Sequence, residues 1–354
     1  MEIPKLEIGD ITADVPIIQG GMGVKVSLSS LASAVANEGA IGTIASVGIG
    51  DIKISLTEYE RASHDGLVTE IRKAKSMTTG HLALNVMGVL SNSDDLIKTA
   101  VTEGIKLIVF GAGLPSRLPG LVGDHPVNLV PIVSSGRGAG LILRTWDKRY
   151  GRIADGFILE GPLAGGHLGF SVEQLEQPDK YSLETLLPEV LEAVKPYEDK
   201  HGRKIPVIAG GGIYDGKDIA RMLSLGASGV QMATRFVCTE ECDVSPEFKQ
   251  AYIDAKEEDI IIIKSPVGMP GRAINNKFLI DVRAGKVSVK CPYKCLATCK
   301  MGEARYCIAL ALLNSCAGDM DHGLIFCGQN AYRLDKIVTV KELIAELLAE
   351  LAAL

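Results

Sequence analysis

Eight short apolar segments recur along the first two-thirds of this chain, and segments with helical spacing of apolar residues separate several of them. The apolar segments are rich in β-branched residues and are bounded by glycine, proline or polar residues. They comprise residues 15–19, 40–44, 81–86, 105–110, 128–133, 156–159, 206–209 and 229–232. The helical patterns cover residues 28–37, 67–75, 94–103, 183–197 and 218–225. Apolar strands that alternate with helices are typical of a parallel sheet covered by helices.

Eight such units predict an α/β fold of the (β/α)8 TIM barrel type, which needs roughly 250 residues. The rival fold is an open doubly wound sheet, which is expected to carry Gly-x-Gly-x-x-Gly after its first strand. Here the first strand is followed by Gly20-Gly21-Met22-Gly23-Val24-Lys25, which lacks that spacing. The barrel is therefore the favoured fold.

The alternating pattern ends near residue 235. We expect an FMN-binding barrel over residues 1–235 and a helical, cysteine-rich C-terminal appendix over residues 236–354 that packs as a lid at the barrel mouth. A closing helix is expected over residues 340–351. Its apolar residues are also compatible with pairing in a homodimer.

Composition excludes several classes of protein. Of the 354 residues, 47% are hydrophobic, which is enough for a large core, and 43 acidic against 37 basic residues give a net charge of −6 without long charged blocks. Nucleic acid is therefore not an expected partner. The N-terminus lacks a basic region followed by an apolar run, and the apolar runs are far shorter than the ~20 residues that span a bilayer. We expect a soluble, cytoplasmic protein without a membrane partner.

The loops after the seventh and eighth expected strands are suited to an anion. Gly211 and Gly212 lie in a run of three glycines, where backbone N–H groups can approach a phosphate without obstruction by a Cβ atom. The segment Gln231, Met232, Ala233 and Thr234 follows at the next strand end. Together the two loops match the usual phosphate site of such barrels. A tight strand-to-helix turn would also require glycine, which is the alternative.

Other candidate ligand contacts lie at the ends of the first and third expected strands. Gly20, Gly21 and Met22 offer permissive backbone for the face or edge of a ring, although a simple tight turn has the same composition. Asn85 offers an amide at the end of an otherwise apolar strand, where it would contact a ligand or cap a turn.

His167 is the histidine with the strongest claim to chemistry. It lies in the glycine-rich stretch Gly165-Gly166-His167-Leu168-Gly169 that follows the sixth strand, at the functional end of a barrel. An imidazole there can act as a base, an acid or a hydrogen-bond donor near neutral pH. A lone histidine is more often structural, and the other five occupy positions that are less suggestive of function.

These segments resemble the family of nitronate monooxygenases (2-nitropropane dioxygenases) and FMN-containing enoyl-acyl-carrier-protein reductases. The matching stretches are residues 16–23, 83–88, 164–169, 209–213 and 229–236, and residues 326–330 resemble the family's C-terminal Gly-Gln segment. The most specific of them is Ala-Gly-Gly-His-x-Gly. One departure is the segment Glu160-Gly161-Pro162-Leu163-Ala164, where many members carry an acidic residue beside the alanine or serine that precedes Gly-Gly-His.

The resemblance implies an FMN-dependent oxidoreductase with His167 as its active-site residue. It implies that Gly20, Gly21 and Met22 contact the isoalloxazine and Asn85 its edge. By the same resemblance, Gly211, Gly212, Gln231, Met232, Ala233 and Thr234 hold the ribityl phosphate. The substrate is then a small molecule or an acyl thioester, and NAD(P)H is a possible electron donor. Nitronate oxidation and the reduction of an enoyl thioester or a quinone stay open as alternatives.

The cysteine-rich stretch raises the question of a metal centre. Cys291, Cys295 and Cys299 are spaced by four residues and Cys307 lies eight further on, so a helix would place the first three on one face. Such thiolates could hold an iron–sulfur cluster or zinc. The spacing is uncommon for either, and reduced thiols packed in the appendix are the favoured interpretation.

Two other functions are compatible with a barrel of this kind. An isomerase or aldolase barrel without flavin would need a strand-end lysine or paired carboxylates, for which Lys25 and Glu160 are the candidates. A barrel that only binds a ligand would not require His167. Four arginines could meet phosphates of NAD(P)H or a carrier-linked substrate at the mouth, or be ordinary surface charges: Arg117, Arg137, Arg144 and Arg272.

Overall fold

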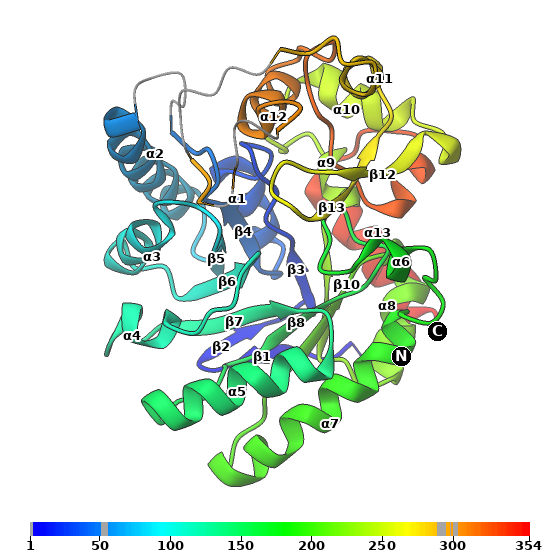
Figure 1. The fold of residues 1–354 in the computed structure, drawn as a ribbon. Coiled ribbons are helices and arrows are strands. Elements are labelled where there is room, and N and C mark those ends of the chain that lie inside the picture. The colour runs from blue at the N-terminus through cyan, green and yellow to red at the C-terminus, as the bar shows by residue number, and fades with distance from the viewer. Residues whose placement is uncertain (1–2, 51–55, 289–294, 298, 300–303) are drawn as a thin grey trace.

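The computed structural model describes residues 3–50, 56–288, 295–297, 299 and 304–354. Its centre is an eight-stranded parallel sheet in which the first and last strands are also neighbours (Figure 1). The strands are β3 (Ile17–Gln19), β4 (Gly42–Ala45), β5 (Leu82–Met87), β6 (Leu107–Gly111), β7 (Asn128–Val133), β8 (Phe157–Glu160), β10 (Val207–Gly210) and β11 (Gly229–Met232). A parallel bridge between Ile18 and Ile41 closes the sheet, which confirms the predicted (β/α)8 barrel.

Helices surround the barrel. They are α1 (Ser29–Asn37), α2 (Leu56–Met77), α3 (Ser93–Thr102), α4 (Leu118–Val122), α5 (Gly136–Tyr150), α7 (Leu183–His201) and α8 (Gly216–Ser224). The predicted helices match α1, α3, α7 and α8 closely, whereas α2 begins well before residue 67. Helix α5 was not predicted, because three glycines in its first two turns interrupt the helical spacing of apolar residues. The Ser135 side chain caps this helix by accepting from the N–H of Gly138, and Trp146 anchors it in the core.

The interior of the barrel is filled by apolar side chains from the strands around it. Ile18, Ile41, Ile158 and Ile208 are fully buried there. An N-terminal hairpin of β1 (Leu6–Ile8) and β2 (Ile11–Ala13) adds Leu6 and other apolar side chains to this cluster. The hairpin, which the sequence analysis did not predict, closes the end of the barrel opposite the site (Figure 1).

The chain after β11 gathers mainly at the other end of the barrel (Figure 1). Its elements are α9 (Thr234–Val237), α10 (Pro246–Ile253), η1 (Glu257–Asp259), β12 (Ile260–Lys264), β13 (Pro270–Ile274), α11 (Lys277–Arg283), α12 (Ile308–Cys316), η2 (Gln329–Arg333) and α13 (Val340–Ala352). The loop after β8 contributes α6 (Val172–Leu175) and β9 (Gly166–His167). Strand β9 pairs with β13, which in turn pairs with β12, so a small antiparallel sheet joins the barrel loop to the later chain.

Helix α13 returns to the barrel instead of staying at the mouth. It packs against α8 and α1 and buries Leu343, Leu347 and Leu351 there, so it fills the place of an eighth outer helix behind the short α9. The division of the chain at residue 235 stays a prediction. No helix in the described ranges combines the length and apolar composition needed to cross a membrane.

Candidate active site

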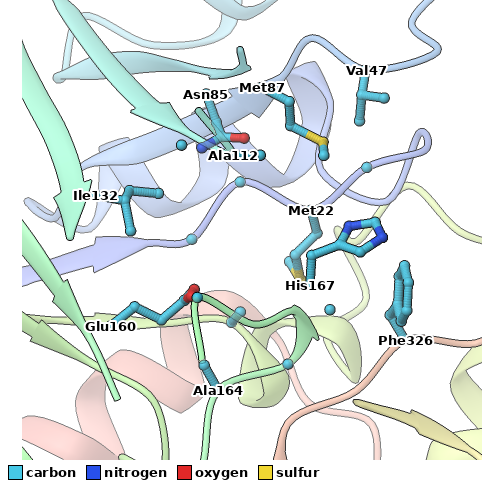
Figure 2. Close-up of a pocket in the computed structure, with 18 of the residues that line it drawn as sticks. Met22, Val47, Asn85, Met87, Ala112, Ile132, Glu160, Ala164, His167 and Phe326 are labelled. Atoms are coloured by element: carbon cyan, nitrogen blue, oxygen red, sulfur yellow. The ribbon is translucent and has the colours of Figure 1, made fainter. Parts of the chain in front are cut away.

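A cavity of about 510 Å³ opens at the carboxyl ends of the barrel strands, between the barrel and the later chain. Every residue that the resemblance assigned to flavin or to catalysis lines this one cavity. They are Gly20, Gly21, Met22, Asn85, His167, Gly211, Gly212, Gln231, Met232, Ala233 and Thr234. Figure 2 shows part of this wall. The tertiary structure thus brings together residues that are more than 200 positions apart in the sequence.

One side of the cavity is formed by a close approach between Gly21 and Asn85. A Cβ atom at Gly21 would lie 2.3 Å from the Cβ of Asn85, so only glycine allows the backbone to lie against this side chain. The amide of Asn85 reaches into the cavity (Figure 2). Within the described part of the chain it has no hydrogen-bond partner, and its donor and acceptor are therefore available to the edge of a polar ring.

The opposite side has the character of an anion cradle. Gly211 and Gly212 have φ values of +103° and +84°, a region that residues with a Cβ rarely adopt. Among the described residues, none accepts a hydrogen bond from the backbone N–H of Gly211, Gly212 or Thr234, and Thr234 begins α9. Backbone N–H groups and a hydroxyl are the donors that a phosphate group requires, so this end of the cavity fits the phosphate of a flavin nucleotide.

The C-terminal segment completes the cradle. The side-chain amide of Asn330 donates to the carbonyl oxygen of Gly212 at 2.8 Å, and the backbone N–H of Gln329 donates to Leu163 at 3.1 Å. A Cβ at Gly328 would lie 2.5 Å from the Oγ1 of Thr234. Residues 326–330, which resemble the family's C-terminal Gly-Gln segment, all line the cavity.

His167 is held by the small sheet rather than by the barrel itself. Its strand, β9, pairs with Gly271 of β13, and its Nε2 lies 2.7 Å from the Oγ of Ser265. Phe326 packs edge-on against the imidazole, with ring centroids 4.9 Å apart, on the side away from Met22 (Figure 2). Burial lowers the pKa of His167 to about 4, so the ring is neutral at physiological pH.

Glu160 is a cavity residue that the sequence analysis considered only for the isomerase hypothesis. It ends β8, and its carboxyl group faces the cavity (Figure 2). Burial raises the pKa of this group to about 8, although the N–H of Gly169 and the charge of Arg272 oppose the rise. It is the only acidic side chain among the described residues that line the cavity. The signal in the sequence was a charged residue directly after an apolar strand.

Ser265 and Arg272 are further residues whose roles the sequence analysis missed. Arg272 does not face the mouth: its guanidinium is buried and donates to the carbonyl oxygens of Pro162, at 2.8 Å, and Ala164. Burial lowers the pKa of Arg272 to about 10. The other three arginines expected at the mouth do not line the cavity either. Arg137 and Arg144 are exposed, and Arg117 forms an ion pair with Asp94 at 3.1 Å. Contacts made across the fold are not visible as sequence motifs.

The remainder of the cavity is mainly apolar, although a few serine and tyrosine side chains also line it. Val47, Met87, Leu90, Ile142 and Phe248 are among the side chains that form it. No lysine or arginine occurs among its described lining residues, and Lys25 lies outside the lining although its neighbours Val24 and Val26 belong to it. The site therefore provides one acid, one neutral imidazole and an uncharged, mainly apolar wall.

The cysteine stretch is described only in part, and Cys291 lies outside the described residues. Cys295 lines the cavity, but the chain there is not helical, because Leu296 forms an antiparallel bridge with Leu90. The helix that would align these cysteines is therefore not seen at this point. In the described ranges, no group of three or more His, Cys, Asp and Glu residues is arranged to hold a metal ion.

Comparison with known proteins supports the family resemblance. The family model described as nitronate monooxygenase matches residues 5–103 and 82–350, which is nearly the whole chain. This chain belongs to the nitronate monooxygenase family. Members of this family are oxidoreductases that depend on flavin.

Curated relatives extend the range of related activities. The chain is 28% identical over 270 residues to the (3aS,4S,5R,7aS)-5-hydroxy-7a-methyl-1-oxo-octahydro-1H-indene-4-carboxyl-CoA dehydrogenase of Mycobacterium tuberculosis, covering 76% of this chain and 66% of the relative. The enzyme of the same name from Rhodococcus jostii is 30% identical over 260 residues, covering 73% and 62%. The chain thus spans less than two-thirds of the length of these relatives. A probable nitronate monooxygenase of Staphylococcus aureus is 34% identical over 36% of this chain and 34% of the relative.

Solved structures share the whole architecture. FabK from Thermotoga maritima superposes with a TM-score of 0.74 at 28% identity, covering 96% of this chain and 94% of that chain. Nitroalkane oxidase from Streptomyces ansochromogenes has the same TM-score at 22% identity, with 96% of each chain covered, and this likeness concerns the fold.

Proposed function

We propose that this chain is an FMN-dependent oxidoreductase whose flavin occupies the cavity at the barrel mouth. The observation that carries the proposal is the combination of donors in one cavity: the N–H groups of Gly211, Gly212 and Thr234 at one side, and the amide of Asn85 at the other. The first set suits a phosphate and the second suits the polar edge of a flat ring. A barrel ligand without a phosphate would provide no acceptor for these N–H groups.

The flavin, when bound, supplies hydride and electron transfer, and the chain provides binding and proton chemistry. The backbone of Gly20 and Gly21 lines the space for a ring without side chains in the way. The neutral imidazole of His167 offers one hydrogen-bond donor and one acceptor, and the carboxyl group of Glu160 holds a proton at neutral pH. Apolar side chains such as Met87 and Phe326 keep bulk water from this region.

Enoyl-thioester reduction is the more specific candidate that the cavity favours. Its described wall carries no cation to bind a small anion such as a nitronate, and it offers mainly apolar contacts to an acyl group. The dehydrogenases of Mycobacterium tuberculosis and Rhodococcus jostii, which are named for a carboxyl-CoA compound, are relatives in agreement with a thioester substrate. NAD(P)H would then be the electron donor. Nitronate oxidation is the alternative, as the family name suggests.

The experiment that tests these assignments begins with the absorption spectrum of protein purified without oxygen. FMN is added, and the holoenzyme is titrated with NADH and then with NADPH. Crotonyl-CoA and propyl-2-nitronate are supplied in parallel as probe substrates. Flavin that is bleached by a nicotinamide and reoxidised by crotonyl-CoA supports the reductase, whereas flavin that is bleached only by the nitronate supports the monooxygenase.

Two further outcomes of this experiment are decisive. If FMN does not bind, the proposed cofactor site is wrong. If flavin binds with a 1:1 stoichiometry and a broad shoulder remains near 400 nm, roughly where iron–sulfur clusters absorb, the cysteine stretch holds a cluster. Metal analysis of the same sample separates that outcome from zinc.

A further inference from the structure

Ser265 lies just outside the cavity, in the tight turn between β12 and β13. Its backbone N–H donates to the carbonyl oxygen of Met269 at 3.2 Å, and its own carbonyl accepts from the N–H of Gly268 at 3.0 Å. The residue is 3% exposed and does not line the cavity. The turn therefore fixes the position of the Ser265 side chain independently of any ligand.

The hydroxyl group of Ser265 has two neighbours in the described part of the chain. Its oxygen accepts from the backbone N–H of Val267 at 3.3 Å, and it lies 2.7 Å from the Nε2 of His167. A serine hydroxyl has one proton to donate. Because Val267 contributes a donor, the acceptor for this proton has to be the imidazole.

The number of donors and acceptors around the Ser265 hydroxyl distinguishes the two neutral forms of His167, each of which carries a single ring N–H. With the proton on Nε2, the serine oxygen would receive two N–H groups and its own proton would be buried without an acceptor, which is unfavourable. With the proton on Nδ1, the hydroxyl donates to Nε2 and still accepts from Val267, and only the Nδ1–H is left for a group in the cavity. The imidazole is neutral because burial lowers the pKa of His167 to about 4.

We infer that Ser265 is a positioning residue that holds His167 in the Nδ1–H form, so that the nitrogen left for the cavity is a hydrogen-bond donor and not a base. Among the described residues, Nδ1 has no hydrogen-bond partner, whereas the imidazole as a whole lines the cavity. A donor at this position selects a substrate with an acceptor oxygen, such as the carbonyl of an unsaturated thioester or an oxygen of a nitronate anion. It cannot remove a carbon-bound proton from a neutral nitroalkane.

The inference rests on the proposed function for its chemical meaning. The tautomer of His167, however, can be measured without any enzymatic turnover. The full chain, loaded with FMN, is labelled with [¹⁵N]histidine, and the ring nitrogens are observed by NMR at pH 7. The signal of His167 is assigned by its loss in His167→Gln. We expect a protonated Nδ1 and an unprotonated, hydrogen-bonded Nε2. A protonated Nε2 would overturn the inference.

Two substitutions at Ser265 separate positioning from a simple structural role. Ser265→Thr keeps the hydroxyl and is expected to keep the Nδ1–H form. Ser265→Ala removes it and is expected to give a mixture of both forms, together with a roughly tenfold or greater fall in kcat and little change in KM for the active probe substrate. Ser224→Ala, at an exposed helix position far from the site, is the matched control and should change neither reading.

The outcomes distinguish this inference from the proposed function. If wild-type protein fails to bind FMN, the proposed function fails, yet the tautomer of His167 is still read from the same spectra. If FMN binds normally and Ser265→Ala leaves the ring nitrogens as in the wild type, the positioning role of Ser265 is wrong while the flavin site stands. Turnover of nitroethane in its neutral form at a rate similar to its nitronate would also contradict a donor-only His167.

Discussion

The guanidinium of Arg272 donates a hydrogen bond to the carbonyl oxygen of Pro162 across 2.8 Å, and its other close acceptor is the carbonyl oxygen of Ala164. Arg272 lies on β13, whereas both carbonyls belong to the loop that leads from β8 to His167. The same loop contacts the phosphate cradle, because a Cβ at Gly211 would lie 3.0 Å from backbone atoms of Gly161 and Ala164. One buried cation thus fixes the loop that joins the two ends of the site.

Replacing this cation should therefore destabilise the protein. Arg272→Met would leave two buried carbonyl oxygens without a donor, and we expect the free energy of unfolding to fall by about 2 kcal/mol or more. Urea denaturation measures the change. The exposed Arg144→Met serves as a matched control, for which we expect a change within about 0.5 kcal/mol. Equal stabilities for the two variants would show that the contacts of Arg272 contribute little.

His167→Gln should remove most of the activity without removing the flavin. A residue that exchanges or donates a proton in the transition state typically contributes a factor of about 100 or more to turnover. We expect a loss of that size in kcat/KM for the active probe substrate, with an FMN dissociation constant close to that of the wild type. His64→Gln, on exposed α2, is the control. If His167→Gln keeps more than a tenth of the activity, His167 is not the active-site residue.

Gly211→Ala should weaken FMN binding. An alanine at φ +103° is strained, and its Cβ would crowd the backbone of Gly161 and Ala164. The cradle would have to shift, and a cost of about 1.4 kcal/mol corresponds to a tenfold larger dissociation constant. Gly140→Ala is the control, because a Cβ in that helix has open space within 4 Å. It should leave FMN affinity unchanged and raise stability by about 0.5–1 kcal/mol. Unchanged affinity in Gly211→Ala would place the phosphate elsewhere.

Glu160 should make stability depend on pH. Because its pKa rises from 4.5 in the unfolded chain to about 8 in the folded chain, the folded state binds more protons between these values. Its contribution is therefore fully present below about pH 4.5 and is lost as the pH rises towards 8, by at most about 1.4 kcal/mol per pH unit. Glu160→Gln removes this loss, so its stability relative to the wild type should improve from pH 5 to pH 8.

Urea denaturation at several pH values tests this expectation, and exposed Glu176→Gln is the control. A constant difference between Glu160→Gln and the wild type across this range would mean that the carboxyl group is ionised in the native protein at neutral pH. The neutral acid would then not be part of the site.

Local patterns in the sequence were enough to predict much of the fold and part of the site. The eight apolar segments coincide with the eight barrel strands, because a strand covered by helices on one side and by the barrel interior on the other must be apolar throughout. The glycines after β3 and β10 and the motif around His167 identified cavity residues from type and position. Helix α5 escaped prediction because Gly136, Gly138 and Gly140 are poor helix formers, and it forms since Ser135 caps it and Trp146 is buried.

The sequence by itself determined the succession of strands along the chain, the strand-end glycines and the location of His167 on a loop at the barrel mouth. Each of these features depends on residues that are close together in the chain. Only the tertiary structure decided how the groups are used. The contact between His167 and Ser265 spans 98 residues, and that between Arg272 and Pro162 spans 110. The pKa values of Glu160 and His167 likewise depend on burial by distant segments. Burial and hydrogen bonding between remote segments arise only when the chain folds, so no local pattern encodes them.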